Sequence, residues 1–213
     1  DVPALPGYWK KISEICNKNK IHLILDEVYC GMGRAGKLYN FLWENISPDF
    51  VCLGKNTTGG HIPLSFVLVK KNYEKTLLRK DGRIKIGHTF QGYSLGVSAA
   101  IQTVKILQSK DFLQKVNNLG LYAQKYLESE LGNSSFFSNI RGRGLQFSLE
   151  HNTPDNERFS DILTRIMFDK YKILINSKWH RTSFTPSLII SKKQIDYSFD
   201  RFIKAFKEAE KLF

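Results

Sequence analysis

Two short apolar runs, each ending in an ionisable residue, limit the fold of this chain more than any other feature of its sequence. The first reads His22-Leu-Ile-Leu-Asp26, and the second reads Asp49-Phe-Val-Cys-Leu-Gly-Lys55. Their length and apolar content predict two neighbouring buried strands of an α/β sheet. Because ligand groups gather at the carboxyl ends of strands in such sheets, we expect Asp26 and Lys55 to lie at one edge.

An acid and an amine at one edge of a sheet match the minimal apparatus for holding pyridoxal 5'-phosphate (PLP). The amine of Lys55 would form a Schiff base with the aldehyde, and the carboxylate of Asp26 would keep the pyridine nitrogen protonated. The alternative interpretation is a solvated or salt-bridged pair, which is the usual state of charges at strand ends. The surrounding sequence decides between the two interpretations.

Three sequence blocks in the same order resemble the class III PLP-dependent aminotransferases. They are Leu23 to Lys37, Pro48 to Lys55, and Gly87-His-Thr-Phe-Gln-Gly92. The resemblance implies the α/β fold of PLP-dependent transferases of fold type I. Residues 1–108 would be the C-terminal part of the large mixed-sheet domain that binds the cofactor, and residues 109–213 the small C-terminal α+β domain.

The resemblance also implies an enzyme that transfers an amino group from an amino donor to a keto acid or aldehyde. Relatives of this kind are much longer, so the turn that binds the cofactor phosphate and the ring that stacks on the pyridine would come from a front half absent here. We therefore expect a homo- or hetero-oligomer with a chain that supplies this half. A glutamate-1-semialdehyde-type aminomutase and a catalytically silent fragment or subunit are the alternatives.

Four residues receive cofactor roles from the resemblance. Lys55 would carry the Schiff base, Asp26 would contact the pyridine nitrogen, and Val28 would pack against one face of the ring. Thr89 would reach the phosphate bound in the neighbouring subunit, which implies a shared site. Tyr29 stands where many relatives have Gln or Met near the phenolic oxygen of the cofactor.

The residue that binds the substrate carboxylate is less directly indicated. Relatives often place an arginine in the pattern Arg-x-x-Pro-Pro-Leu, whereas this chain reads Arg181-Thr-Ser-Phe-Thr-Pro-Ser-Leu188, with Ser183 at the arginine's place. An offset of two residues keeps a side chain on the same face of a strand, displaced by about 6–7 Å. Arg181 is therefore the candidate, and Arg34, Arg141 and Arg143 are the others.

Composition narrows the class of protein. The 213 residues include 32 Lys and Arg against 20 Asp and Glu, a net charge of +12, but the basic residues are scattered and form no aromatic-interleaved motif for nucleic acid. We find no apolar run of about 18 residues that would span a membrane. The three cysteines have no metal-binding spacing, and the first residues lack the features of a signal peptide. These observations favour a cytoplasmic enzyme without nucleic-acid, membrane or metal partners.

The periodicity of apolar residues predicts a series of helices and strands. Glu27, between Asp26 and Val28, is expected to be either structural or a support for the site. The helix at 94–107 is apolar on all sides and is therefore expected to be buried. The expected helices cover residues 8–20, 94–107, 111–131, 157–170 and 192–213, and the expected strands cover 23–25, 50–53, 64–69, 140–150 and 173–175.

Overall fold

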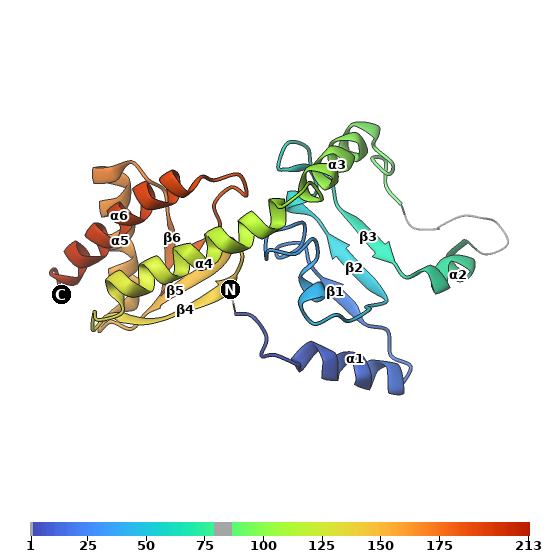
Figure 1. Cartoon of the computed structure of the whole chain (residues 1–213), viewed down its shortest axis with the longest axis horizontal. Coiled ribbons are helices and arrows are strands. Elements are labelled where there is room, and N and C mark those ends of the chain that lie inside the picture. The colour runs from blue at the N-terminus through green and yellow to red at the C-terminus, as the bar shows by residue number, and fades with distance from the viewer. Residues whose placement is uncertain (1, 79–86) are drawn as a thin grey trace. The chain divides into compact units, whose positions relative to one another are not determined.

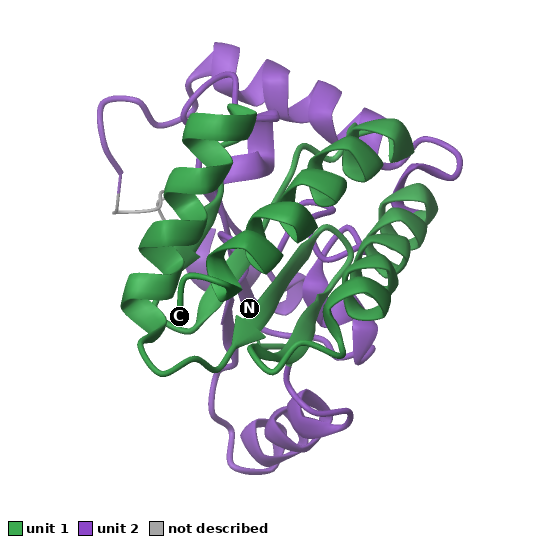
Figure 2. Ribbon diagram, turned by 90° about the vertical axis from the view of Figure 1, so that its left-hand side faces the viewer, with its two compact units in different colours: residues 1–3, 114–213 green, residues 4–113 purple. Residues whose placement is uncertain are grey.

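The computed structural model describes residues 2–78 and 87–213, which form two compact units (Figures 1 and 2). The N-terminal unit comprises residues 4–113, and the C-terminal unit comprises residues 114–213 with the first residues of the chain. The domain boundary between residues 108 and 109 stays a prediction. Within the described part of the chain, no helix combines the length and apolarity needed to cross a membrane.

The N-terminal unit contains a three-stranded sheet in the order β1-β2-β3 (Figure 1). Strand β1 (Ile24–Asp26) is parallel to β2 (Phe50–Leu53), which confirms that the two apolar runs form neighbouring strands. Strand β3 (Phe66–Val69) is antiparallel to β2 and begins two residues later than predicted. The remaining elements are the helices α1 (Tyr8–Lys18), α2 (Glu74–Leu78) and α3 (Ser94–Leu107) and the short 3-10 helices η1 (Asn40–Trp43), η2 (Lys55–Thr58) and η3 (Lys71–Tyr73).

The two faces of this sheet differ in burial. Leu25 and Val51 are register partners on one face, and both are buried. On the other face, Ile24, Val67 and Val69 keep 60%, 53% and 39% of their surface exposed. Successive side chains of a strand point to opposite faces, so the strands of this unit have an apolar core on one side and an exposed apolar surface on the other.

Helix α3 corrects one expectation. Its bounds are those predicted, but Leu95, Val97, Ile101 and Ile106 are exposed rather than buried. A helix that is apolar on all sides buries only the side that meets a neighbour, and here that side carries small residues such as Gly96, close to Leu64. The exposed side is a second apolar surface of the N-terminal unit.

The C-terminal unit contains a four-stranded antiparallel sheet in the order β4-β5-β7-β6. The strands are β4 (Phe137–Arg143), β5 (Gln146–His151), β6 (Asn176–Lys178) and β7 (Arg181–Phe184), and the helices are α4 (Phe112–Leu131), α5 (Asn156–Tyr171) and α6 (Lys192–Glu210). An aromatic cluster joins the sheet to α5 and α6, since Phe147 and Phe184 contact Phe199, and Phe159 contacts Phe206.

Two strand predictions in this unit were wrong. The segment 140–150 forms a hairpin rather than one strand, because Gly142 (φ 158°) and Gly144 (φ 54°) adopt backbone conformations that allow the chain to reverse. The segment 173–175 forms no strand. Lys172 ends α5 in the left-handed conformation, and the N–H of Ile173 donates to the carbonyl of Met167. The start of this segment therefore caps the C-terminus of α5.

Candidate active site

The two strand ends place Asp26 and Lys55 at one edge of the N-terminal sheet. Asp26 is the last residue of β1 and lies opposite Cys52 of β2. Lys55 follows Cys52 by three residues and begins η2. The carboxylate of Asp26 is exposed and accepts a hydrogen bond of 3.0 Å from the N–H of Val28.

The backbone at Lys55 is strained. Its φ of 46° lies in the left-handed region, which costs a residue with a side chain about 1 kcal/mol or more. The preceding Gly54 is extended, and a Cβ there would lie 3.3 Å from Cγ1 of Val28. Val28 therefore packs over the bend that presents the lysine, and strain of this kind is frequent at functional residues.

The amine of Lys55 is exposed and forms a cation–π contact with Tyr29. Its Nζ lies 5.4 Å from the centroid of the Tyr29 ring. Among residues 2–78 and 87–213, no acid lies within the 4.0 Å of an ion pair with it. The salt-bridge interpretation of Lys55 requires such an acid, so the described residues do not support that interpretation.

The residues after Lys55 hold the loop in place through their side chains. Asn56 Nδ2 donates to the carbonyl of Met32 over 2.7 Å, and Thr57 Oγ1 donates to the carbonyl of Leu64 over 2.7 Å. Thr58 Oγ1 donates to the carbonyl of Ile62. These bonds tie η2 to the glycine-rich loop of residues 31–36 on one side and to the segment that leads into β3 on the other.

Glu27 has a structural role. It is buried, and its carboxylate accepts hydrogen bonds of 2.7 Å from the N–H groups of Asn40 and Phe41, at the start of η1. Burial raises the pKa of Glu27 and is the largest effect, while the two backbone donors lower it. Of the two roles left open by the sequence, the contacts favour the structural one.

We expect Glu27→Gln to lower the free energy of unfolding by about 2 kcal/mol, because the amide nitrogen of Gln cannot accept a hydrogen bond and one buried N–H loses its partner. Urea unfolding followed by circular dichroism measures the change. The matched control is Glu14→Gln on the exposed part of α1, which should change stability by less than about 0.5 kcal/mol. Equal effects of the two substitutions would contradict the anchoring role of Glu27.

The three cysteines are free and half-buried. Burial, together with the charges of Glu27 and Asp26, raises the pKa of the Cys30 thiol to about 11. The thiol beside the candidate site is therefore protonated at neutral pH.

Thr89 lies in an exposed turn that leads into α3. Its neighbours His88 and Phe90 line a groove of about 1580 Å³, and the N–H of Phe90 donates to Nδ1 of His88 over 3.2 Å. The exposure of Thr89 leaves its hydroxyl available to another chain. Its contact with a phosphate stays a prediction.

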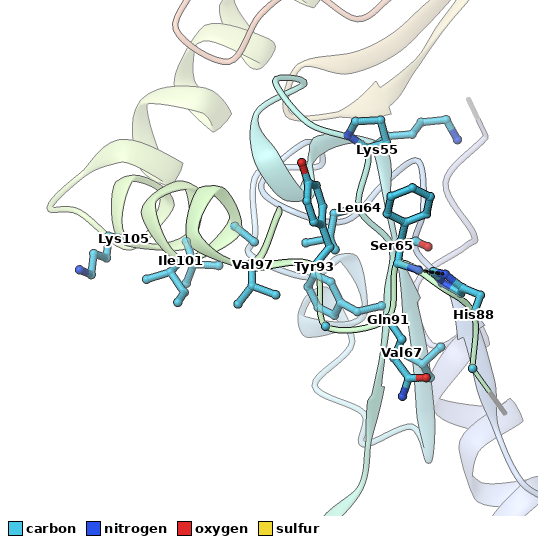
Figure 3. A pocket seen from close by; sticks show the side chains of 17 residues that line it. Lys55, Leu64, Ser65, Val67, His88, Gln91, Tyr93, Val97, Ile101 and Lys105 are labelled. Carbon is cyan, nitrogen blue, oxygen red and sulfur yellow. Dashed lines mark hydrogen bonds between the residues drawn. The ribbon is translucent and has the colours of Figure 1, made fainter. Parts of the chain in front are cut away.

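The groove runs from Lys55 along β3 and α3 (Figure 3). Most of its wall is apolar, with Val67 from β3 and Val97 and Ile101 from α3, and Lys105 lies at its far end. Asp26 is not among the residues that line it. The groove is thus a hollow in the exposed apolar surface next to the lysine, and not the space between the lysine and the acid.

Arg181 begins β7 in the C-terminal unit, opposite Glu150 of β5. Arg141 of β4 forms an ion pair with Glu150. Ser183, which stands at the arginine's place in the family pattern, has its Oγ 3.2 Å from Oγ of Ser148. The sequence did not indicate these partners, since cross-strand pairs depend on a register that no local pattern specifies.

The model of the family described as aminotransferase class-III matches residues 1–206. The chain belongs to the class III aminotransferase family. An aminotransferase of Gibberella zeae is 35% identical over 149 residues, which cover 70% of this chain and 29% of that protein. An ornithine aminotransferase of Brevibacillus brevis is 32% identical over 199 residues, 92% of this chain and 46% of that protein.

Solved structures agree with this membership. An ornithine aminotransferase from Toxoplasma gondii, crystallised with partial occupancy of PLP at its active site, has a TM-score of 0.85 and 26% identity, over 97% of this chain and 47% of that chain. These matches confirm the predicted fold type I architecture. The Brevibacillus brevis protein and the Toxoplasma gondii structure each match most of this chain. The chain spans about half the length of each of them.

The residues present fit one side of a PLP site. An exposed amine, a carboxylate at the neighbouring strand end and the apolar side chain of Val28 next to Gly54 are the groups that an aldehyde, a pyridine nitrogen and a ring face require. The class III aminotransferases are PLP-dependent, and the covalent role of Lys55 stays a prediction.

Proposed function

We propose that this chain is the lysine-bearing part of a PLP-dependent aminotransferase that moves an amino group from an amino donor to a keto acid or aldehyde. The observation that carries the proposal is the exposed amine of Lys55, which forms no ion pair with a described acid, at the same sheet edge as Asp26. When bound, PLP supplies the electron sink for the reaction. Lys55 would hold the cofactor and then move the proton at the substrate carbon, Asp26 would keep the ring nitrogen protonated, and Val28 would pack on the ring.

We further propose that another polypeptide segment completes the site. The N-terminal unit exposes apolar side chains from two elements, namely Ile24 and Val67 on the sheet and Val97 and Ile101 on α3. Exposed apolar surface of this kind marks a surface that another polypeptide covers. The segment that covers it would add the phosphate-binding turn and the stacking ring. Thr89 would contact a phosphate in a neighbouring subunit, which makes the enzyme an oligomer, and we place it in the cytoplasm.

The test is to add PLP to the purified chain, alone and with any co-purifying partner, and to treat each sample with borohydride. We expect a visible absorption that borohydride converts to a stable adduct on Lys55, located by mass spectrometry of peptides. Lys55→Ala should abolish this adduct. Lys105→Ala, which removes a lysine from the same groove, should keep it.

The outcomes separate the candidates. An adduct that forms only with the partner supports a site completed by two polypeptides. An adduct in the chain alone supports a site that this chain forms by itself. Absence of the adduct in both settings contradicts the proposal and favours the catalytically silent subunit. If the adduct forms, single-turnover mixing with amino donors distinguishes the aminomutase alternative, because an aminotransferase releases a keto product whereas an aminomutase returns the amino group to the same carbon skeleton.

A further inference from the structure

The turn that follows β1 holds Tyr29 in a fixed place at the edge of the N-terminal sheet. The N–H of Gly31 donates to the carbonyl of Glu27 over 2.9 Å and closes the turn that contains Tyr29. A Cβ on Gly31 would lie 2.8 Å from that carbonyl oxygen, so the turn is tight. The carboxylate of Glu27 is anchored in turn by two N–H groups of η1. The backbone of Tyr29 is therefore constrained, although 46% of the residue is exposed.

The ring of Tyr29 and the amine of Lys55 meet at this edge. The 5.4 Å between Nζ and the ring centroid lies within the range of about 6 Å in which a cation is attracted to an aromatic face. Lys55 comes from the strained bend after β2, so both partners are presented by constrained backbone. Tyr29 stands where many relatives have Gln or Met, and neither of these side chains has an aromatic face.

The other charged and titratable groups of this edge and of the groove do not replace the ring. Asp26 lies outside ion-pair distance of Lys55, and its Oδ1 accepts from the N–H of Val28. His88 and Lys105, which line the groove with Lys55, are bases (Figure 3). Burial lowers the pKa of the Arg34 guanidinium, and the charge of the Tyr29 phenol opposes this. Among the described residues, the ammonium of Lys55 has an aromatic ring against it and no acid.

We propose that the ring of Tyr29 is a resting place for the ammonium of Lys55, which keeps the amine in its charged, unreactive form until an aldehyde engages it. The inference rests on the proposed function for the aldehyde, which PLP would supply. It assigns Tyr29 as a positioning residue that acts through Lys55.

The chemistry of condensation explains why such a contact matters. An amine attacks an aldehyde only in its neutral form, so the ammonium first gives one proton to water. The nitrogen lone pair then forms the C–N bond, and the aldehyde oxygen leaves as water with the two hydrogens that remained on nitrogen. A ring that stabilises the ammonium competes with the first of these steps, so its removal should make Lys55 more reactive.

Trace acetylation of the purified, cofactor-free chain with acetic anhydride at pH 8 measures this reactivity, and mass spectrometry of peptides gives the extent at each lysine. We expect Tyr29→Leu to increase labelling of Lys55 about threefold, the effect of losing one exposed cation–π contact. Tyr29→Phe, which keeps the ring and removes the hydroxyl, should label as the parent does. Tyr8→Leu on α1 is the control, since Tyr8 has a similar exposure of 51%.

Two other lysines of the N-terminal unit are internal references. Lys105 lines the same groove, and Nζ of Lys37 lies 5.1 Å from the ring centroid of Trp43. Their labelling should be the same in the parent and in all three variants. In NMR spectra of the parent, the Cε protons of Lys55 should be shifted upfield by the ring, and this shift should persist in Tyr29→Phe and vanish in Tyr29→Leu.

The proposal is overturned by unchanged labelling of Lys55 in Tyr29→Leu, or by equal labelling of Lys55 in the Phe and Leu variants, which would assign the effect to the hydroxyl. If Tyr29→Leu loosens the fold, labelling of Lys37 and Lys105 also rises, and the upfield shift in the unaltered parent then decides: its absence overturns the contact. These measurements use no PLP. Failure of the Tyr29 contact is therefore visible separately from failure of the PLP adduct.

Discussion

Gly120→Ala is expected to destabilise the C-terminal unit by at least about 3 kcal/mol. Gly120 lies in α4, directly against the turn between β4 and β5, and an added Cβ would overlap the carbonyl oxygen of Gly144. The overlapped atom belongs to the backbone, so no side-chain rotation relieves the clash. Helix propensity alone predicts the opposite sign, since Ala is about 1 kcal/mol better than Gly inside a helix.

Thermal and urea unfolding of Gly120→Ala measure this effect. The matched control is Gly96→Ala in α3, where the nearest atoms to an added Cβ are side-chain atoms of Leu64 and Tyr93 at 3.3 and 3.4 Å, which can shift. We expect the control to change stability by less than about 1 kcal/mol. A stable Gly120→Ala variant would show that α4 and the turn at Gly144 do not touch.

Acid is expected to weaken the C-terminal unit through His151, by about 3 kcal/mol between pH 6.5 and pH 4. His151 is buried, with Nδ1 3.4 Å from Oδ1 of Asn156 and Nε2 3.3 Å from Oγ of Ser160. Burial lowers the pKa of His151 to about 4, the bond to Asn156 opposes this, and His180 adds to it. The unfolded chain therefore binds a proton at a higher pH than the folded chain does, and the free energy of unfolding falls as the pH falls.

The measurement is urea unfolding of the parent chain and of His151→Gln at pH 7, 5.5 and 4. Carboxylates also titrate in this range, so the relevant quantity is the difference between the two proteins at each pH. We expect His151→Gln to be less stable at pH 7, where it loses ring packing against Phe159, and the gap to close as the pH falls. A gap that stays constant would mean that His151 does not titrate with a lowered pKa.

The sequence predicted those parts of the fold that local patterns encode. Apolar runs located β1 and β2, and apolar periodicity located α6, which was expected over 192–213 and spans Lys192–Glu210. The strand predictions that were wrong concern segments whose pairing depends on distant parts of the chain. The segment 173–175 is rich in residues typical of strands, yet β7 pairs with Asn176–Lys178, because strand register is decided by the whole sheet.

In the candidate site, too, the sequence predicted what local patterns encode and missed what contacts between distant segments decide. Asp26 and Lys55 could be found because each lies at or just beyond the end of an apolar strand, and the parallel pairing of β1 with β2 brings both strand ends to one edge. The role of Glu27 could not be found, because its partners lie 13 and 14 residues away in a loop. The exposed apolar side of α3 was missed because the sequence of one helix does not say which of its sides has a neighbour.

The raised pKa of Cys30 has a consequence for the chemistry of an aldehyde held at this edge of the sheet. Thiolates add to carbonyl carbons as readily as amines do, whereas protonated thiols are poor nucleophiles. With a pKa of about 11, roughly one Cys30 in ten thousand is ionised at pH 7. Burial of this sulfur atom therefore keeps Cys30 unreactive toward an aldehyde held at this edge of the sheet.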